Sequence, residues 1–220
     1  MEIVPGFETL QYSRYERHGD VAYVTISRPE VMNALHTEAH FELATVWDAF
    51  VDDPSLRVAV LTGEGERAFC AGRDLKDRAA RGSQGPDRPP TGGGGLTHRF
   101  DREKPIIARV NGFALGGGFE IALACDVIIA VDHAEFGLPE PRRGLIAGSM
   151  GVHRLPRQVP LKAAMGYLLT GCHMTAQRAF ELGLVNEVTT RAGLDAAVDR
   201  WVADVLSRTG TDDSGGPTVG

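Results

Sequence analysis

The chain is poor in cysteine, and the cysteines it has show no pattern of cross-linking or metal binding. Its 220 residues contain only Cys70, Cys125 and Cys172. This is an odd number without any C-x-x-C spacing, which argues against a disulfide framework and against a zinc site, so no metal is expected. We predict a protein of a reducing, cytoplasmic environment.

Long apolar runs and an excess of positive charge are also missing. No stretch approaches the ~18 apolar residues of a membrane span. Residues 1–20 lack the basic region followed by an apolar region that marks a secretory signal. The formal net charge of -6 disfavours a nucleic-acid partner, because binding to a phosphate backbone needs clustered Lys and Arg. We therefore expect neither a membrane nor a nucleic acid as a partner.

Three common catalytic signatures are absent or incomplete. The sequence has no G-x-x-x-x-G-K-[ST] phosphate loop and no G-x-S-x-G nucleophile elbow. The stretch GEGERA at 63–68 matches the outline of a dinucleotide fingerprint, but that fingerprint needs a helix starting within it and an acidic residue at a strand end ~20 positions later. Asp87 instead lies in a Gly/Pro-rich tract, so we reject a dinucleotide site.

What the sequence does contain is an alternation of strands and helices in a chain of ordinary globular composition, 43% hydrophobic and 24% charged. Short β-branched or apolar runs closed by Gly or Pro predict strands, and apolar stripes at i, i+3, i+4 and i+7 predict helices. Such alternation implies crossovers and a mainly parallel sheet, which places the chain in the α/β class. The predicted strands are 21–27, 58–63, 105–111 and 126–131, and the predicted helices are 37–51 (capped by Thr37), 160–169, 176–182 and 193–207.

Two segments show neither pattern. Residues 79–97 and 209–220 are rich in Gly, Pro, Ser and Asp, a composition that buries too little apolar surface to order a chain. We predict that both are mobile and that 1–208 form a single domain.

Two loops are candidates for holding a negatively charged oxygen. In NGFALGGGFE at 111–120, three glycines precede a predicted helix, whose first N–H groups have no intrahelical partner. AFCAGRDL at 68–75 follows the strand 58–63, at the edge of a parallel sheet where ligands collect. Converging N–H groups from two such loops would form an oxyanion hole. Each loop taken alone is equally compatible with an ordinary packing turn.

The candidate chemical groups are two glutamates, Glu120 at the end of GGGFE and Glu140 in FGLPEP. Two glutamates in an acidic chain are more often solvated surface residues than catalysts. Both, however, follow apolar neighbours, and partial burial would raise the pKa of each carboxyl towards neutrality. Such carboxyls suit general acid and base catalysis.

Taken together, these residues resemble the enoyl-CoA hydratase/isomerase (crotonase) family, from about Val21 to about Leu206. No single motif carries the resemblance, but their order and spacing do. The landmarks are SRPEVMNAL at 27–35, AFCAGRDL at 68–75, KPIIARVNGFALGGGFEIALACDVIIA at 104–130, FGLPE at 136–140 and TAQRAFELGLVNEV at 175–188.

The resemblance implies a spiral of turns, each made of strands and a helix, that binds an acyl-CoA thioester. Ala71 and Gly117 match the family's oxyanion-hole donors, and Glu120 and Glu140 match its two carboxylates. Glu120 would activate water for attack on Cβ, while Glu140 would protonate Cα. No separate cofactor is implied, because coenzyme A is part of the substrate. The implied substrate- and CoA-binding residues are Val31, Ala71, Gly72, Arg73, Asp74, Leu75, Gly116 and Gly117.

Because both glutamates are present, the resemblance favours an enoyl-CoA hydratase of fatty acid metabolism. An enoyl-CoA isomerase or another acyl-CoA lyase of the family is the alternative within enzymes. Departures in 140–158, with Arg142 and Arg143 after the acid and Ser149-Met150 where small residues are usual, could reshape the acyl pocket or, for the arginines, be solvated charges.

The end of the chain also departs from the pattern. Family members usually continue well beyond the helix predicted to end near Ser207, and the resemblance implies a homotrimer or dimer of trimers built in part by that continuation. We therefore keep a further alternative, an inactive acyl-CoA-binding or assembly subunit, and expect Trp201 and Val202 to be partly exposed.

Overall fold

A computed structural model describes residues 1–81 and 86–208 of the chain. The predicted tail at 209–220 lies outside the described residues. The strands are β1 (Glu2–Ile3), β2 (Ser13–His18), β3 (Val21–Ile26), β4 (Val58–Gly63), β5 (Ala68–Cys70), β6 (Ile106–Val110), β7 (Phe113–Leu115), β8 (Val127–Val131), β9 (Glu135–Gly137), β10 (His173–Thr175) and β11 (Glu187–Thr189). The α-helices are α1 (Thr37–Asp52), α2 (Leu75–Arg81), α3 (Gly117–Ala122), α4 (Gly151–Gln158), α5 (Leu161–Thr170), α6 (Ala176–Glu181) and α7 (Leu194–Arg208), with short 3₁₀ turns η1 (Pro29–Val31), η2 (Gly93–Gly95), η3 (Glu140–Arg143) and η4 (Arg191–Gly193).

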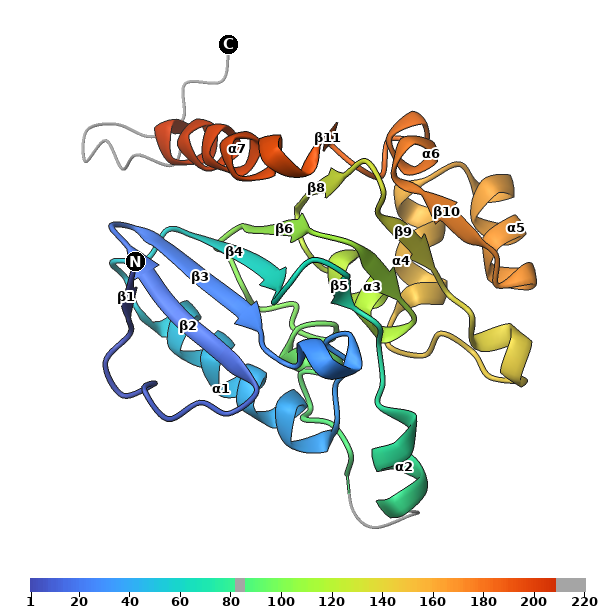
Figure 1. Ribbon diagram of the computed structural model, residues 1–220, viewed down its shortest axis with the longest axis horizontal. Helices are drawn as coiled ribbons and strands as arrows, with labels where there is room; N and C mark the ends of the chain where they lie inside the picture. Colours follow the sequence, from blue (N-terminus) through green and yellow to red (C-terminus); the bar gives the residue numbers. More distant parts are fainter. Residues whose placement is uncertain (82–85, 209–220) are drawn as a thin grey trace.

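The strands form two sheets in a mixed α/β architecture (Figure 1). The larger sheet has the order β1-β2-β3-β4-β6-β8-β11, in which β3 to β11 run parallel and β1 and β2 are antiparallel additions. The smaller sheet has the order β10-β9-β7-β5, with β10 antiparallel to β9. The prediction of a mainly parallel sheet with helical crossovers is confirmed.

Successive turns of the chain repeat one pattern. Each of β4, β6 and β8 in the larger sheet is followed within a few residues by β5, β7 or β9 in the smaller one. Helix α2 follows β5, and α3 follows β7. This repetition is the spiral that the resemblance implies, and it brings the segments after β5, β7 and β9 to one side of the molecule.

Helices α1 and α7 cover the larger sheet, with α1 beside β2 and α7 beside β4, β6 and β8 (Figure 1). The predicted stripe of α1 is buried, since Leu43, Val46, Trp47 and Phe50 all lie in the core. Thr37 is not the N-cap, however. The helix is preceded by His36 in extended conformation, and the Thr37 N–H and hydroxyl both donate to Asp77 of α2.

The apolar stripe of α7 packs more completely than expected. Val202 is only 7% exposed, so the expectation of exposure is wrong for this residue. Trp201 is half-buried, and its indole Nε1 donates to Glu187 Oε2 at 2.9 Å. Pairing of the indole N–H lets the ring cover apolar surface without leaving a polar group unsatisfied.

The expectation of a mobile segment at 79–97 is wrong for its described part. Residues up to Arg81 belong to α2, and the glycines of η2 are buried against α1. The Trp47 Nε1 donates to Gly94 O at 2.9 Å, and the Gly94 N–H donates to His40 Nδ1 at 2.8 Å. Side chains of the helix therefore satisfy the backbone of this loop.

No helix among the described residues combines the length and the apolar character needed to cross a bilayer. Cys70, Cys125 and Cys172 are free thiols. The predicted cytoplasmic location and trimeric assembly stay predictions.

Candidate active site

The two candidate oxygen-binding loops lie directly against each other. Gly72, after β5, has a positive φ of 90°, and a Cβ there would lie 2.6 Å from Leu115 O and 2.9 Å from Gly117 N. At Gly118 in α3, a Cβ would lie 2.0 Å from Cys70 O. Contacts this short exclude any side chain, so glycine is required at both positions for the loops to meet.

Two side-chain amides hold the first of these loops in place. The Asn33 Nδ2 donates to the carbonyls of Glu64 and Ala68, and the Asn111 Nδ2 donates to the carbonyls of Gly63 and Gly65. Both amides are buried, so these hydrogen bonds fix the turn between β4 and β5. The position of the loop after β5 follows from that turn.

One backbone N–H from each loop is available to a ligand. The N–H groups of Arg73 and Gly117 have no hydrogen-bond acceptor in the described part of the chain, and a Cβ on Gly117 would lie 3.8 Å from Arg73 N. The N–H of Ala71, by contrast, donates to Met32 O at 3.0 Å. An N–H that already donates within the fold has no hydrogen left for a ligand, so Ala71 is not available as the predicted donor, and Arg73 is the candidate donor in this loop.

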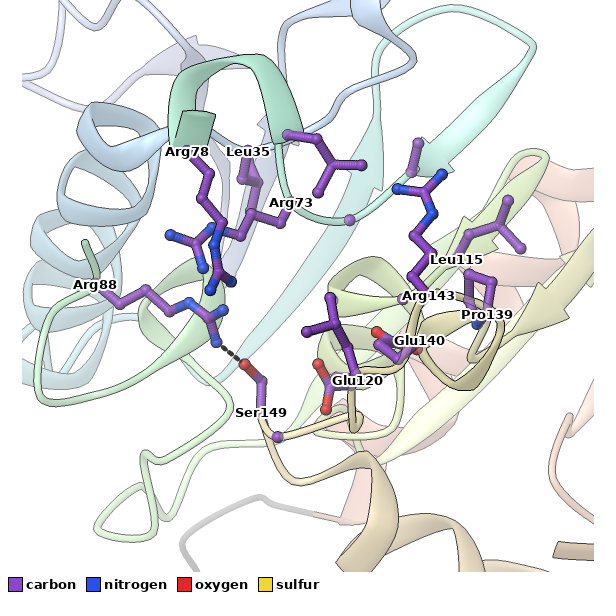
Figure 2. A pocket seen from close by; sticks show the side chains of 18 of the residues that line it. Leu35, Arg73, Arg78, Arg88, Leu115, Glu120, Pro139, Glu140, Arg143 and Ser149 are labelled. Atoms are coloured by element: carbon purple, nitrogen blue, oxygen red, sulfur yellow. Dashed lines mark hydrogen bonds between the residues drawn. The ribbon is translucent and has the colours of Figure 1, made fainter. Parts of the chain in front are cut away.

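These N–H groups open onto a cavity of about 370 Å³ that gathers most of the predicted site residues (Figure 2). Figure 2 shows Glu120 and Glu140 side by side at its centre, with arginines around them. The lining residues are Met32, Leu35, His40, Ala71, Gly72, Arg73, Leu75, Arg78, Arg88, Gly93, Leu115, Gly116, Gly117, Glu120, Pro139, Glu140, Arg143, Leu145, Ile146, Gly148 and Ser149.

Glu120, in α3, is the more deeply buried of the two carboxyls at 3% exposure. Burial raises its pKa to about 7, because a charged carboxylate loses its hydration there. The Gly151 N–H donates to Glu120 Oε1 at 2.8 Å and opposes this rise, while the nearby Glu140 adds to it. The result is a carboxyl that exchanges its proton near neutral pH, as expected from its apolar sequence neighbours.

Glu140 begins the 3₁₀ turn η3 and is half-buried. Its carboxylate lies over the glycine loop, since a Cβ on Gly116 would be 3.0 Å from Glu140 Oε1. Burial raises its pKa as well, against smaller opposing effects of its own backbone N–H and of Arg143 and Arg88. The Oε2 atom is buried and has no hydrogen-bond partner among the described residues, which leaves it free to act on a ligand.

Two predicted binding residues are not part of the cavity. Val31 lies in η1 and does not line it, whereas the next residue, Met32, does. Asp74 pairs with Arg28 at 3.2 Å and accepts from the Lys76 N–H at 3.1 Å. It therefore stabilises the start of α2, since a carboxylate at a helix N-terminus satisfies free N–H groups. Ala71, Gly72, Arg73, Leu75, Gly116 and Gly117 all line the cavity.

Three polar residues of the cavity were not predicted from the sequence, namely His40, Arg78 and Arg88. His40 falls within the predicted helix at 37–51 and shares a face with Leu43 and Trp47, so a histidine within an apolar stripe was the available signal. Arg88 lies in the Gly/Pro-rich tract and carried no signal of its own. Of the departures noted in 140–158, Arg143 and Ser149 line the cavity, whereas Arg142 is exposed and donates to Thr170 O.

The described residues contain no cluster of three or more His, Cys, Asp or Glu side chains placed as metal ligands are. The groups that the cavity offers are two carboxyls with raised pKa, two free backbone N–H groups and several guanidinium groups. Such a set can bind a carbonyl oxygen through the two N–H groups and transfer protons at the carbon chain next to that carbonyl group.

Comparisons with known proteins agree with this geometry. The family model described as enoyl-CoA hydratase/isomerase matches residues 16–210. A carnitinyl-CoA dehydratase of Citrobacter koseri is 45% identical over 180 residues, which cover 82% of this chain and 69% of the relative. One of Proteus mirabilis is 46% identical over 192 residues, covering 86% and 72%.

Solved structures show the same relationship. The structure of a carnitinyl-CoA dehydratase from Mycobacterium avium superimposes with a TM-score of 0.85 at 41% identity, covering 91% of this chain and 78% of that one. An enoyl-CoA hydratase from Mycobacterium tuberculosis gives a TM-score of 0.82 at 40% identity, covering 90% and 76%. Both the sequence match and the fold lead to one conclusion: the chain belongs to the enoyl-CoA hydratase/isomerase (crotonase) family of enzymes.

Proposed function

We propose that the protein catalyses the reversible addition of water to the α,β double bond of a 2-enoyl-CoA thioester. The observation that carries this proposal is the pair Glu120 and Glu140, two carboxyls with raised pKa in the cavity onto which the free N–H groups of Arg73 and Gly117 open. The names of the relatives, dehydratase and hydratase, support the same type of reaction.

Substrate binding would use both the backbone and the charge of the cavity. The N–H groups of Arg73 and Gly117 would donate to the thioester oxygen and stabilise the negative charge that develops on it. The side chains of Arg73, Arg78 and Arg143 also line the cavity. Guanidinium groups are well suited to the phosphates of coenzyme A.

In the hydration direction, the Glu120 carboxylate takes a proton from water as the water oxygen bonds to Cβ. The π electrons move to the thioester, giving an enolate whose oxygen the two N–H groups hold. The Glu140 carboxyl then gives its proton to Cα. Elimination is the reverse, in which Glu140 removes the Cα proton and Glu120 protonates the departing hydroxyl group.

The pair works only when it carries a single proton, and burial decides where that proton rests. Glu120 is more deeply buried than Glu140, so its charged form is the less favourable one. The free enzyme therefore keeps the proton mainly on Glu120 and the charge on Glu140. This is the form ready for elimination from a 3-hydroxyacyl-CoA.

The pH dependence of kcat/KM should be bell-shaped in both directions. Above about pH 7, Glu120 ionises, the pair loses its last proton, and kcat/KM should fall about tenfold per pH unit. At low pH both carboxyls are protonated, and the rate falls again. Because hydration neither consumes nor releases a proton, the two directions should share one profile. Measurements of kcat/KM from about pH 5 to about pH 9 test this, and a flat profile across neutral pH would contradict it.

The function itself is tested by incubating the protein with a 2-enoyl-CoA and with a 3-hydroxyacyl-CoA. We expect loss or gain of the absorbance of the conjugated thioester and a product heavier or lighter by one water. Conversion of a 3-enoyl-CoA without a change in mass, and no hydration, would identify an isomerase instead. Calorimetric binding of acyl-CoA without any turnover would identify a binding subunit.

A further inference from the structure

The cavity has an exposed rim and a buried floor. Leu75 and Ile146 at the rim are 45% and 69% exposed, whereas His40 and Ser149 are 5% and 2% exposed. Coenzyme A is too large for about 370 Å³ and must extend over the rim. The floor beside His40 and Ser149 is therefore the place for the far end of the acyl group.

His40 presents a hydrogen-bond donor at this floor. The Gly94 N–H donates to Nδ1 at 2.8 Å, so Nδ1 must be the unprotonated nitrogen. Burial, reinforced by the positive charges of Arg88 and Arg73, lowers the pKa of His40 to about 3, so the ring is neutral. The neutral ring must then carry its hydrogen on Nε2. That atom is buried and has no partner in the described part of the chain.

Arg88 and Ser149 add two further donors. Arg88 Nη1 donates to Ser149 Oγ (Figure 2). Because the Ser149 oxygen accepts in this hydrogen bond, its hydroxyl hydrogen is left to donate to a ligand. The Nε of Arg88 is buried and has no hydrogen-bond partner among the described residues. The neighbouring Asp87 pairs with Arg73, and its Oδ1 also lies 4.0 Å from the Arg88 Nε, which is an ion-pair contact but too long for a hydrogen bond. Glu120 and Glu140 also act on Arg88 through their charge, but neither accepts a hydrogen bond from it within the described chain, so the Arg88 Nε–H stays available to a ligand.

The chemistry of the floor selects against a cationic acyl group. The described residues that line the cavity include no Phe, Tyr or Trp, and aromatic rings are what usually surround a quaternary ammonium group in proteins. A carnitinyl group ends in such an ammonium, which would meet the guanidinium of Arg88. Donors and positive charge fit an oxygen acceptor instead, and a carboxylate best of all.

We propose that His40, Arg88 and Ser149 form a subsite that binds a carboxylate at the far end of the acyl chain, so that the substrate is a carboxyacyl-CoA. The proposal rests on the proposed acyl-CoA function. It makes His40 and Arg88 specificity-determining residues that contact the substrate away from the reacting carbons.

The test compares acyl-CoAs of equal length whose far end is a carboxylate, a methyl group or a trimethylammonium group. Saturated members of the series are titrated by calorimetry for Kd, and the 2-enoyl members are assayed for kcat/KM. We expect the carboxylate to be preferred over the methyl group by roughly 10- to 100-fold, which is the size of a charged hydrogen bond. The trimethylammonium compound should bind most weakly.

Substitutions assign the preference to residues. His40→Leu and Arg88→Met should each reduce the ratio of carboxylate to methyl affinity towards one, whereas His40→Gln, which can accept from Gly94 and still donate, should keep most of it. His18→Leu, an exposed histidine of β2, is the matched control and should leave the ratio as in the wild type. A wild-type preference for the methyl or trimethylammonium end, or a ratio that survives both His40→Leu and Arg88→Met, overturns the subsite. Binding ratios still decide the subsite if no turnover occurs, so its failure is separable from failure of the hydratase proposal.

Discussion

Replacing Glu120 or Glu140 with glutamine should lower kcat for hydration by about 10³-fold, the contribution of a positioned acid or base. Glutamine keeps the size of the side chain, and at position 120 its oxygen can still accept from the Gly151 N–H. It cannot take or give the proton, however. Because the two residues act as one unit, the double variant should lose little more than either single one.

Proton exchange at Cα separates the two roles. Exchange of a saturated acyl-CoA with deuterated water needs only Glu140 and the oxyanion-holding N–H groups. It should therefore survive in Glu120→Gln and disappear in Glu140→Gln, as measured by mass. Glu181→Gln removes a carboxylate from an exposed ion pair with Arg178 and serves as the control that should retain full activity. Wild-type turnover in both active-site variants would refute the paired role, and exchange that persists only in Glu140→Gln would reverse the division of labour.

The sequence predicted the parts of the fold in which burial follows a simple period. The strand at 58–63 was predicted to the residue, and α1, α5, α6 and α7 begin and end within a residue of their predicted bounds. In these elements the apolar positions repeat over many residues, and Gly or Pro marks their ends. Burial against the neighbouring elements is therefore visible in the sequence as a periodic spacing of apolar residues.

Short strands and glycine-rich loops escaped prediction because their contacts lie far away in sequence. Strands β5, β7 and β9 have three residues each, too few for any period. The loop at η2 has the composition of a disordered segment. Its backbone is nevertheless hydrogen-bonded to Trp47 and His40, which lie 47 and 54 residues away from Gly94 in the sequence. The composition of a segment indicates how much apolar surface that segment can bury. It does not reveal the hydrogen-bond partners that a distant helix provides.

The candidate site was predicted in its charges more completely than in its hydrogen bonds. The apolar neighbours of Glu120 and Glu140 correctly indicated burial and a raised pKa. The choice between Ala71 and Arg73 as donor depended on the carbonyl of Met32, which no local pattern reveals. The orientation of the His40 ring likewise depends on a single N–H of η2. Hydrogen bonds to the backbone depend on tertiary structure in both cases, so they could not be predicted from the sequence.

The stability of the protein should fall as the pH rises past the ordinary pKa of a glutamate, and Glu120 should be the cause. Its pKa is about 7 in the folded protein against 4.5 as the ordinary value, so the folded state binds this proton more tightly than the unfolded state does. The contribution of this proton to the free energy of unfolding is therefore fully present below pH 4.5 and is lost as the pH rises from that value to about pH 7. Since one pKa unit corresponds to about 1.4 kcal/mol, the loss should reach roughly 3 kcal/mol.

Glu120→Gln removes this titration, because glutamine is neutral at every pH. Relative to the wild type, the variant should gain up to about 3 kcal/mol in the free energy of unfolding near pH 8 and less than about 1 kcal/mol near pH 5. Urea unfolding followed by circular dichroism at the two pH values measures the difference, with Glu181→Gln as the control for a solvated carboxyl. An equal effect of Glu120→Gln at both pH values would mean that its carboxyl titrates normally. A gain confined to the higher pH, together with lost turnover, would show that the burial which raises the pKa of Glu120 for proton transfer also lowers the free energy of unfolding.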